Sequence, residues 1–284
     1  MTGRTVLTVA ALTVKEASRR RVLLALAALT VALLALSAFG FSRINAELGT
    51  LTSGEGRLVA AQVLNLVMFG LSLIAALGTA FLAGPTLAGE IESGMALAVL
   101  ARPVRRSAVL VGKWLGLVAF GSGFVAVAGF AQFLVVWFTV GYWPPQPVAG
   151  LALLAGQTTV LLTLGLLLST AVSPMASGIV AVGLFGATWI AGVVGGVGKA
   201  LDNAGVAQVG TVSRMVLPTD GLWRGAMHAF QDPAALAQFG GPAVQGGFPF
   251  LSEAPLTTTY LAWVGLWVAL VLGLTSVALL RRDL

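Results

Sequence analysis

The stretch VLLALAALTVALLALSAFGF, residues Val22–Phe41, runs for 20 residues without a charged side chain. As a helix, about 20 apolar residues cross the roughly 30 Å hydrocarbon core of a lipid bilayer. This run is therefore predicted to span a membrane. It is too long for the apolar core of a typical signal peptide and no clean small-residue cleavage site closes it, so we expect it to be retained.

Five further apolar runs of similar length follow along the chain. Between the third and fourth of the six lies GYWPPQP, residues 141–147, whose three prolines cannot continue a helix. Tyr142 and Trp143 in this turn suit the headgroup layer. Six spans is the best count, and five remains open if one run is re-entrant. The five later runs are Leu58–Ala83, Trp114–Phe138, Val148–Ala171, Ala176–Val197 and Thr258–Leu280.

The composition agrees with this interpretation. Of 284 residues, 58% are hydrophobic and only 9% are charged, whereas a soluble domain carries about 25% charged residues. The net charge of +6 comes from basic clusters beside the apolar runs, which sets orientation in a bilayer and does not indicate nucleic acid. The sequence thus predicts an all-α, polytopic protein whose partner is the lipid bilayer, with residues 1–284 forming a single transmembrane domain.

The basic residues also predict which side of the membrane each loop occupies. With six spans, both termini, the segment between spans 2 and 3 and the hairpin between spans 4 and 5 share one side. That side holds 11 of the 16 basic residues, while on the other side five basic residues face six acids. Basic residues mark the cytoplasmic face, so both termini are predicted to be cytoplasmic and the membrane to be the cell (plasma) membrane. The 11 residues are Arg4, Lys15, Arg19, Arg20, Arg21, Arg102, Arg105, Arg106, Lys113, Arg281 and Arg282.

Two segments outside the spans are predicted to be helical. Residues 1–21 precede the first span and would lie along the cytoplasmic surface as an interfacial helix, with Lys15 in water and the stems of Arg19, Arg20 and Arg21 on lipid. Ordinary flanking charge explains this segment equally well. Spans 1–5 occupy residues 22–198, and residues 257–284 hold span 6 and a cytoplasmic tail. Residues 199–256 form the one sizeable extracytoplasmic loop.

Within this loop, Pro218-Thr219-Asp220 is typical of a helix start, with Thr219 as the N-terminal cap. The helix that follows, residues 221–230, would place Trp223 near a membrane interface. We expect the helices of this loop to fold back toward the bilayer as external re-entrant helices.

No catalytic motif is present in the sequence. The nearest candidate for a phosphate-binding loop, GGVGKA at residues 195–200, has Val193 where the first glycine should stand and Ala200 where a hydroxyl should hold Mg²⁺. The chain has no Cys and one histidine, His228, which we interpret as a surface or helix-packing residue, so a zinc site is not expected. We predict a non-catalytic chain with no metal and no cofactor of its own.

The only polar side chains deep in the predicted spans are neutral: Gln62, Asn65, Gln132 and Gln157. Such groups either hydrogen-bond between helices or line a substrate path, and the sequence alone leaves both open. A sodium site built from backbone carbonyls also stays open. Carriers driven by protons or charge usually keep an ionisable residue at this depth. Its absence here predicts that the energy for transport comes from another polypeptide.

The most specific pattern lies between spans 2 and 3. A short helix is predicted there, at about residues 93–100, near the membrane surface. The basic residues of the segment fit the orientation rule, but Glu90 and Glu92 do nothing for orientation. The full pattern is Glu-x-x-x-Gly, an apolar stretch, Arg-Pro-Val-x-Arg and Gly-Lys, in the form of Glu90, Gly94, Arg102, Pro103, Val104, Arg106, Gly112 and Lys113.

This order resembles the ABC-2 family of type 2 ABC transporter permeases, most of all the branch containing the permease of the nitrous-oxide-reductase copper-maturation transporter. The stretch Leu217–Arg224 resembles a family feature before the last span. The resemblance implies a dimer, with a second copy or a paralogue, and two cytoplasmic ATPase subunits that hold the ATP and Mg²⁺. It assigns ATPase coupling to the segment 90–106, with Glu90, Glu92, Gly94, Arg102, Pro103, Arg105 and Arg106.

The same resemblance implies an external gate formed by helices at residues 206–217 and 219–230, with Pro218, Asp220, Trp223 and Arg224. It also suggests that Gly183, Gly186, Gly192, Gly195 and Gly196 in span 5 pack at the dimer seam, although ordinary membrane-helix composition explains these glycines as well.

Three functions follow from the sequence. The leading one is the membrane permease of an ATP-driven exporter. The second is a membrane subunit that transmits the work of an ATPase to an extracytoplasmic partner. The third is a self-contained carrier or channel.

Overall fold

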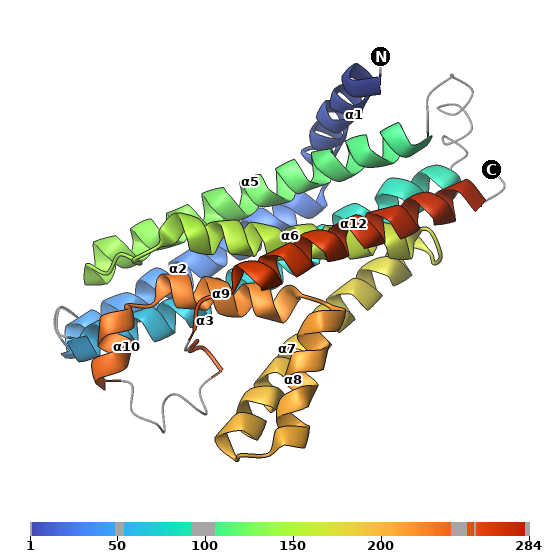
Figure 1. Cartoon of the computed structure of the whole chain (residues 1–284). Coiled ribbons are helices and arrows are strands. Elements are labelled where there is room, and N and C mark those ends of the chain that lie inside the picture. Colours follow the sequence, from blue (N-terminus) through green and yellow to red (C-terminus); the bar gives the residue numbers. More distant parts are fainter. Residues whose placement is uncertain (1, 49–53, 93–105, 240–248, 253, 282–284) are drawn as a thin grey trace.

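The computed structural model is an elongated bundle of helices lying side by side (Figure 1). It describes residues 2–48, 54–92, 106–239, 249–252 and 254–281. Within these residues, six helices are long and apolar enough to cross a membrane, which confirms the predicted count of six. They are α2 (Val22–Leu48), α3 (Gly54–Glu92), α5 (Arg106–Val140), α6 (Pro147–Ser169), α7 (Pro174–Ala200) and α12 (Thr258–Arg281).

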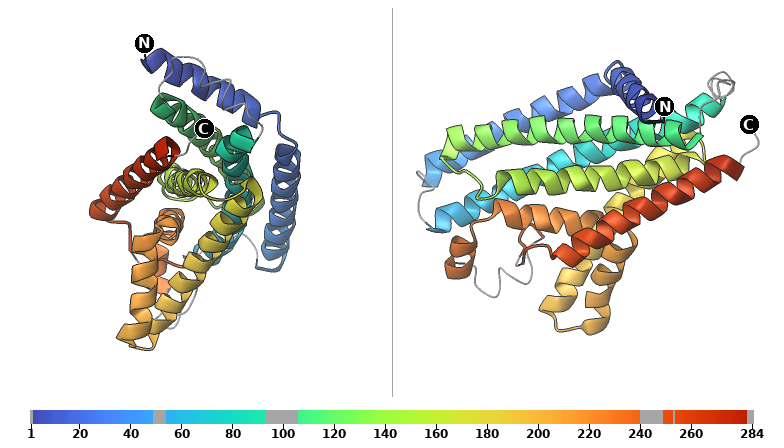
Figure 2. Two further views of the ribbon diagram at one scale, coloured as in Figure 1. Left: turned by 90° about the vertical axis from the view of Figure 1, so that its right-hand side faces the viewer. Right: turned by 45° about the horizontal axis from the view of Figure 1, so that its top comes forward.

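Helix α6 lies at the centre of the bundle, as the end-on view in Figure 2 shows. It packs against α3, α5, α7, α9 (Thr219–Phe230) and α12. The consecutive residues 160–164 of α6 are all buried, so the helix is enclosed on every side. A helix that is apolar all round belongs in such a position. By contrast, α2 and α12 lie at the periphery and leave much of their apolar surface exposed.

Local sequence signals set several helix ends. Pro147 and Pro174 stand in the first turns of α6 and α7, where a missing N–H costs nothing. Gly141 follows α5 with a φ of +72°, the left-handed conformation that commonly ends a helix. Asn203 caps α8 (Ala204–Val216), because its Oδ1 accepts a hydrogen bond from the Val206 N–H at 3.2 Å.

Two helices are far longer than a span requires. Helix α3 has 39 residues and α5 has 35, which correspond to about 58 and 52 Å, against roughly 30 Å of hydrocarbon. The end of α3 and the start of α5 lie at the end of the bundle that also carries both chain termini (Figure 1). We call this the terminal end and the opposite one the distal end. The predicted helix at about residues 93–100 lies outside the described residues.

The remaining helices pack on this frame. Helix α1 (Thr2–Ala17) lies against α5, and α8 lies beside α7. Helix α9 runs along α6, and α10 (Pro233–Phe239) packs against α3 near the distal end. The predicted helix over residues 1–21 is thus shorter than expected and ends at Ala17. The predicted helix at residues 219–230 has the bounds of α9.

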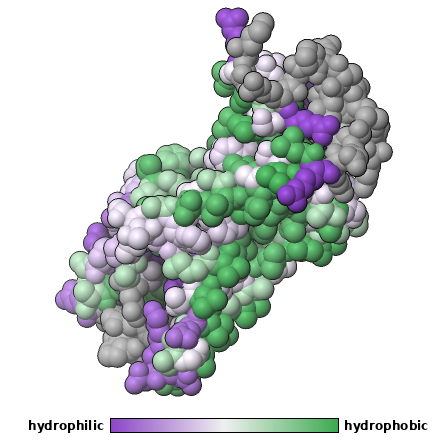
Figure 3. Space-filling view, turned by 45° about the vertical axis from the view of Figure 1, so that its right-hand side comes forward, coloured by the Kyte–Doolittle hydropathy of each residue, from purple (hydrophilic) through white to green (hydrophobic). Residues whose placement is uncertain are grey.

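The outer surface of the bundle is largely apolar. Figure 3 shows hydrophobic side chains as a broad band along the molecule, with hydrophilic residues gathered toward its two ends. Large apolar side chains are exposed on several spans, among them Leu36 of α2, Val127 of α5 and Leu270 of α12. Apolar surface on this scale is unfavourable in water and suits a lipid environment.

One local prediction was wrong, and two aromatic residues predicted at a membrane interface have buried side chains. Thr219 does not cap α9: its hydroxyl lies 2.9 Å from that of Thr188, and Pro218 occupies the cap position. Trp223 is only 1% exposed and packs in the core against Phe69, with ring centroids 5.5 Å apart.

Tyr142 is also buried, and its hydroxyl donates a 2.6 Å hydrogen bond to the Phe230 carbonyl. In each of these cases a polar or amphipathic side chain contacts a residue of another helix. Such a contact between helices cannot be predicted from the local sequence.

Candidate functional site

The residues assigned to ATPase coupling are only partly described. Glu90 and Glu92 belong to the last turn of α3, and Arg106 is the first residue of α5. The Arg106 guanidinium donates to the Leu279 carbonyl of α12 at 3.4 Å, which joins the start of α5 to the end of the last span. Gly94, Arg102, Pro103 and Arg105 lie outside the described residues.

Lys113, which follows the coupling segment in the chain, binds α5 to the part of α3 that precedes this segment. It is 6% exposed, and its ammonium donates a 2.8 Å hydrogen bond to the Thr86 carbonyl of α3. This carbonyl follows Pro85, which stands inside α3 and has no N–H to give to the helix. A buried ammonium is costly without a partner. The contact therefore ties together the two helices that lead into and out of residues 93–105.

Helix α1 docks on α5 over two glycines one helical turn apart. A Cβ at Gly112 would lie 2.7 Å from the Val9 Cβ, and one at Gly116 would lie 2.6 Å from the Ala10 carbonyl oxygen. Small residues four apart allow two helix backbones to approach closely. Gly112 was noted in the sequence pattern, but its contact with α1 was not predicted.

The basic residues in the last turn of α1 and just after this helix are mostly exposed. Lys15, Arg19 and Arg21 are exposed, while Arg20 is half-buried and forms an ion pair with Glu16 one turn before it. Exposed pairs of this kind contribute little stability. Their role in lying on a membrane surface stays a prediction.

Three of the four neutral polar side chains in the spans make hydrogen bonds between segments. The Asn65 amide donates to the Phe250 carbonyl at 2.9 Å, and the Gln132 amide donates to the Ser37 hydroxyl. Gln157 accepts a bond from the Ser72 hydroxyl at 2.7 Å and donates to the Thr219 carbonyl at 3.2 Å. Gln62 is half-buried. A role in lining a substrate path stays a prediction for all four.

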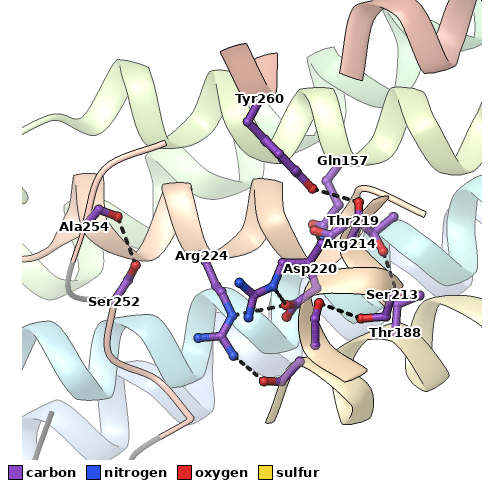
Figure 4. A network of polar contacts seen from close by, with 12 residues as sticks. Gln157, Thr188, Ser213, Arg214, Thr219, Asp220, Arg224, Ser252, Ala254 and Tyr260 are labelled. Carbon is purple, nitrogen blue, oxygen red and sulfur yellow. Dashed lines mark hydrogen bonds and ion pairs between the residues drawn. The ribbon is translucent and has the colours of Figure 1, made fainter. Parts of the chain in front are cut away.

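The bond from Gln157 to Thr219 shows where α9 begins. Gln157 lies near the middle of α6, so the start of α9 is level with the centre of the bundle. The Thr219 hydroxyl also contacts Thr188 of α7, so α3, α6, α7 and α9 meet at one polar point (Figure 4).

Asp220, the next residue, forms a buried ion cluster. Its side chain is 1% exposed, and one carboxylate oxygen accepts bonds from Arg214 Nε at 2.8 Å and from Arg224 Nε at 3.1 Å. Arg224 also donates to the Gly192 carbonyl of α7 at 2.7 Å. Figure 4 shows both guanidinium groups directed at the carboxylate. The three residues, from α8 and α9, form what we call the Asp220 cluster.

Gly192 makes room for the cluster. A Cβ at this position would lie 2.2 Å from a carboxylate oxygen of Asp220, which no side chain could tolerate. Gly195 and Gly198, on the same face, lie close to α8 in the same way. A Cβ at Gly195 would clash with Gly210, and a Cβ at Gly198 would clash with Ala207. Gly192 and Gly195 therefore serve packing inside this chain, whereas Gly183 and Gly186 have open space beside them. A place at a dimer seam stays a prediction for Gly183 and Gly186.

Three aromatic side chains of α12 satisfy the end of α8. The last carbonyls of a helix have no partner within it. The Tyr260 hydroxyl donates to the Arg214 carbonyl at 3.1 Å, and the indole N–H groups of Trp263 and Trp267 donate to the carbonyls of residues 215 and 216 at 3.2 and 2.8 Å. These donors stand at the spacing i, i+3, i+7, on one face of α12. The sequence shows the spacing, but not the helix end that the donors reach.

Beside the Asp220 cluster lies a cavity of about 530 Å³ between α7, α8, α9, the segment that precedes α12 and the start of α12 itself. Arg214 and Arg224 form part of its wall, together with Lys199 and the Tyr260 hydroxyl. Other lining residues are apolar and include Val193, Met215 and Leu256. The cavity could not be predicted from the sequence, because its wall forms only where α7, α8, α9 and the described residues from 249 to 260 pack together.

At the distal end, the loop after α9 is held by further contacts. Arg57 of α3 pairs with Asp232 at 3.1 Å, and Asp232 also caps α10 by accepting from the Ala234 N–H. His228 Nδ1 lies 3.3 Å from the Ser252 carbonyl, in agreement with its prediction as a helix-packing residue. Among the residues that the structure describes, no group of three or more His, Asp or Glu side chains could hold a metal ion.

Together, six apolar helices of spanning length and an apolar outer surface define a polytopic helical membrane protein. The chain belongs to the ABC-2 family: the family model described as ABC-2 family transporter protein matches residues 7–284. None of the curated proteins is significantly similar to it. Membership makes the chain the membrane subunit of an ABC transporter. Such permeases work with cytoplasmic ABC ATPases and are generally not catalytic themselves.

Proposed function

We propose that this chain is the permease of an ATP-driven exporter, and that a separate cytoplasmic ATPase drives it through residues 90–106. The observation that carries the proposal is the meeting of α1, the end of α3 and the start of α5 at the terminal end. The length of α3 and α5 lets them project beyond the hydrocarbon toward a soluble partner. In this proposal the terminal end faces the cytoplasm of a cell membrane, as the basic residues predict.

The contacts at the terminal end would let α1, α3 and α5 transmit a movement as one rigid unit. Lys113 ties α5 to α3, and the glycine pair of α5 holds α1 at backbone distance. Movement of residues 93–105 would therefore shift α1, α3 and α5 together, because packed helices move as units. The acids Glu90 and Glu92 and the arginines that follow offer complementary charge for a docking partner.

The proposed external gate is the Asp220 cluster with its neighbours Pro218 and Trp223. In the proposed orientation α8 and α9 re-enter the outer half of the membrane, and Asp220 lies beside the centre of the bundle. Its two arginines bridge α8, α9 and α7, so the helices cannot separate without exposing a buried carboxylate. An uncompensated buried charge costs several kcal/mol, about 3–5 in typical cases, which keeps the gate closed until work is supplied.

Reconstitution tests the function directly. Vesicles that contain only this chain should show neither uphill transport nor ATP hydrolysis, and both should appear when the cognate ATPase and ATP are added. Uphill transport by the chain alone would overturn the proposal and favour a self-contained carrier. Co-purification from native membranes would provide the cognate ATPase and would show whether a second copy or a paralogue completes a dimer.

Charge reversal tests the coupling segment. The double variant Glu90→Lys with Glu92→Lys should insert normally but lose most of the captured ATPase and of the stimulated ATP hydrolysis. Its matched control is Glu47→Lys with Glu55→Lys, which makes the same charge change at the distal end of α2 and α3. Equal capture by both double variants would remove the coupling assignment.

The nitrous-oxide-reductase copper-maturation branch stays a proposal about ancestry. The motif around Arg102-Pro103-Val104 supports it.

A further inference from the structure

The cavity beside the Asp220 cluster has more positive charge than the cluster uses. Lys199, which is exposed, and the partly exposed Arg214 and Arg224 line it, and among the described residues the carboxylate paired with the two arginines is that of Asp220. Three positive charges against one leave a surplus of two. Among the described lining residues none is acidic. A surplus of charge in a partly enclosed site calls for a counter-ion.

The guanidinium groups also keep donors to spare. An arginine has five N–H donors. Hydrogen bonds among the described residues use one N–H of the Arg214 side chain and two of Arg224. The side chains of Arg214 and Arg224 are 21% and 23% exposed, so their remaining donors are not sealed in the core. Thr211, Thr257 and Tyr260 add hydroxyl groups to the same wall.

The rest of the wall is apolar. Val193 and Val197 of α7, Met215 of α8, and Leu251 and Leu256 before α12 line the cavity. A volume of about 530 Å³ lies within the range of small-molecule sites, roughly 300–1,000 Å³. A ligand that fits must therefore be anionic at one end and apolar at the other.

We propose that this cavity binds the phosphate group of an amphiphile, with the phosphate on Lys199, Arg214 and Arg224 and the apolar tail on the wall of Val193, Val197, Met215, Leu251 and Leu256. Phosphate matches the site because a monoester carries about −1.5 to −2 charges at pH 7, close to the surplus of two. Arginine also binds phosphate through paired N–H donors. The source is either a lipid headgroup or a soluble phosphate ester, since both offer this chemistry.

The proposal concerns binding and does not rest on ATP-driven transport, so it is tested without an ATPase. The full chain in dodecyl maltoside micelles, which carry no phosphate, is titrated by calorimetry with hexyl phosphate, with inorganic phosphate and with the neutral analogue 1-hexanol, against empty micelles. Hexyl phosphate should bind saturably, at least about tenfold more tightly than 1-hexanol, and its affinity should fall as salt rises. Absence of saturable binding by either phosphate probe would overturn the proposal.

Comparison of the two phosphate probes tests the apolar wall. Tighter binding of hexyl phosphate than of inorganic phosphate supports a lipid-like amphiphile. Equal binding of the two supports the anion site but overturns the part of the proposal that concerns the apolar wall. Equal binding of hexyl phosphate and 1-hexanol would overturn the assignment of the cations.

Variants that leave the Asp220 cluster intact locate the site. Lys199→Gln should weaken hexyl phosphate binding about 3- to 5-fold, and Thr211→Glu, which adds a carboxylate to the wall, should weaken it about tenfold or more. The matched control is Arg43→Gln, an exposed cation of α2 that lies over the Phe39 ring and outside the cavity. A loss of affinity in the control equal to that in Lys199→Gln would show that binding follows net charge, and would overturn the site.

Glu253 needs its own variant. It stands in the sequence between the lining residues Ser252 and Ala254 but lies outside the described residues. Unchanged or tighter binding by Glu253→Gln supports a positively charged cavity, because removal of an acid can only favour the anion. Weaker binding would show that this carboxylate helps to form the site, and would count against the proposal.

Discussion

Replacement of Asp220 by asparagine tests the physical basis of the proposed gate. The change keeps the shape of the side chain but removes the negative charge that two arginines share. Asp220 is 1% exposed and its partners are 21% and 23% exposed, so all three are poorly solvated. Loss of one partner from a buried ion pair costs about 3–5 kcal/mol. Because the arginines retain some contact with solvent, we expect the lower end, about 3 kcal/mol.

The same chain provides a matched control. Asp232→Asn also removes a carboxylate from an arginine, but Arg57 is 56% exposed and Asp232 is 19% exposed. A pair of this kind contributes about 0–1 kcal/mol. For a chain of this size 1 kcal/mol corresponds to about 2–4 °C. Asp220→Asn should therefore lower the Tm by about 6–12 °C, and Asp232→Asn by less than about 4 °C.

The assay is thermal unfolding of each purified variant in detergent, followed by the loss of the monodisperse peak in size-exclusion chromatography. The double variant of Asp220→Asn with Arg214→Gln should recover part of the loss, since it removes one of the unpaired cations. Equal shifts for Asp220→Asn and Asp232→Asn, or no shift at all for the former, would refute the assignment of Asp220 as a buried, charge-paired node.

Three further predictions follow from the packing. Gly116→Val should displace α1, because its Cβ would lie 2.6 Å from the α1 backbone. Trypsin should then cleave the chain after α1 faster than in the parent protein. Gly123→Val, which has open space beside it, is the control and should be cleaved at the parent rate. Trp267→Phe removes the N–H that satisfies the last carbonyl of α8, and should lower the free energy of unfolding by about 1–3 kcal/mol in denaturant titration; no change would show that water satisfies that carbonyl. Burial raises the pKa of Tyr142 above its usual value near 10, so the unfolded chain loses this proton first and the stability of the fold should fall as pH rises above about 10. Tyr142→Phe should lower stability at neutral pH by about 1 kcal/mol, because the hydrogen bond to Phe230 is lost. The same variant should show a weaker decline of Tm at alkaline pH.

Much of the fold could be predicted because each span is encoded by one continuous stretch of apolar sequence. A run without charge must be helical in lipid, since each backbone polar group needs a partner within the same segment. Prolines at 147 and 174 and the glycine at 141 then mark where helices begin and end. Even α9 was located correctly from a short amphipathic pattern, although its cap was not, because Thr219 bonds to Thr188 across the bundle.

The candidate site was predictable only in part. Asp220 and Arg224 were named from a resemblance, without their partner Arg214 and without the carbonyl of Gly192 that completes the cluster. The search for ionisable groups within the spans found none, because this cluster reaches the centre of the bundle on α8 and α9, which are not spans. Residues six and 32 positions apart meet there through a fold that no local pattern contains.

From the sequence, hydropathy predicts a membrane protein with a best count of six spans, and one motif indicates the family, because each of these signals lies within a short stretch of chain. The packing of the helices shows that α6 is the buried centre, that Gly192 of α7 makes room for Asp220, and that three cations line one cavity. These features depend on which helix faces meet, and in a bundle of apolar helices that choice is made by close packing and hydrogen bonding between distant residues.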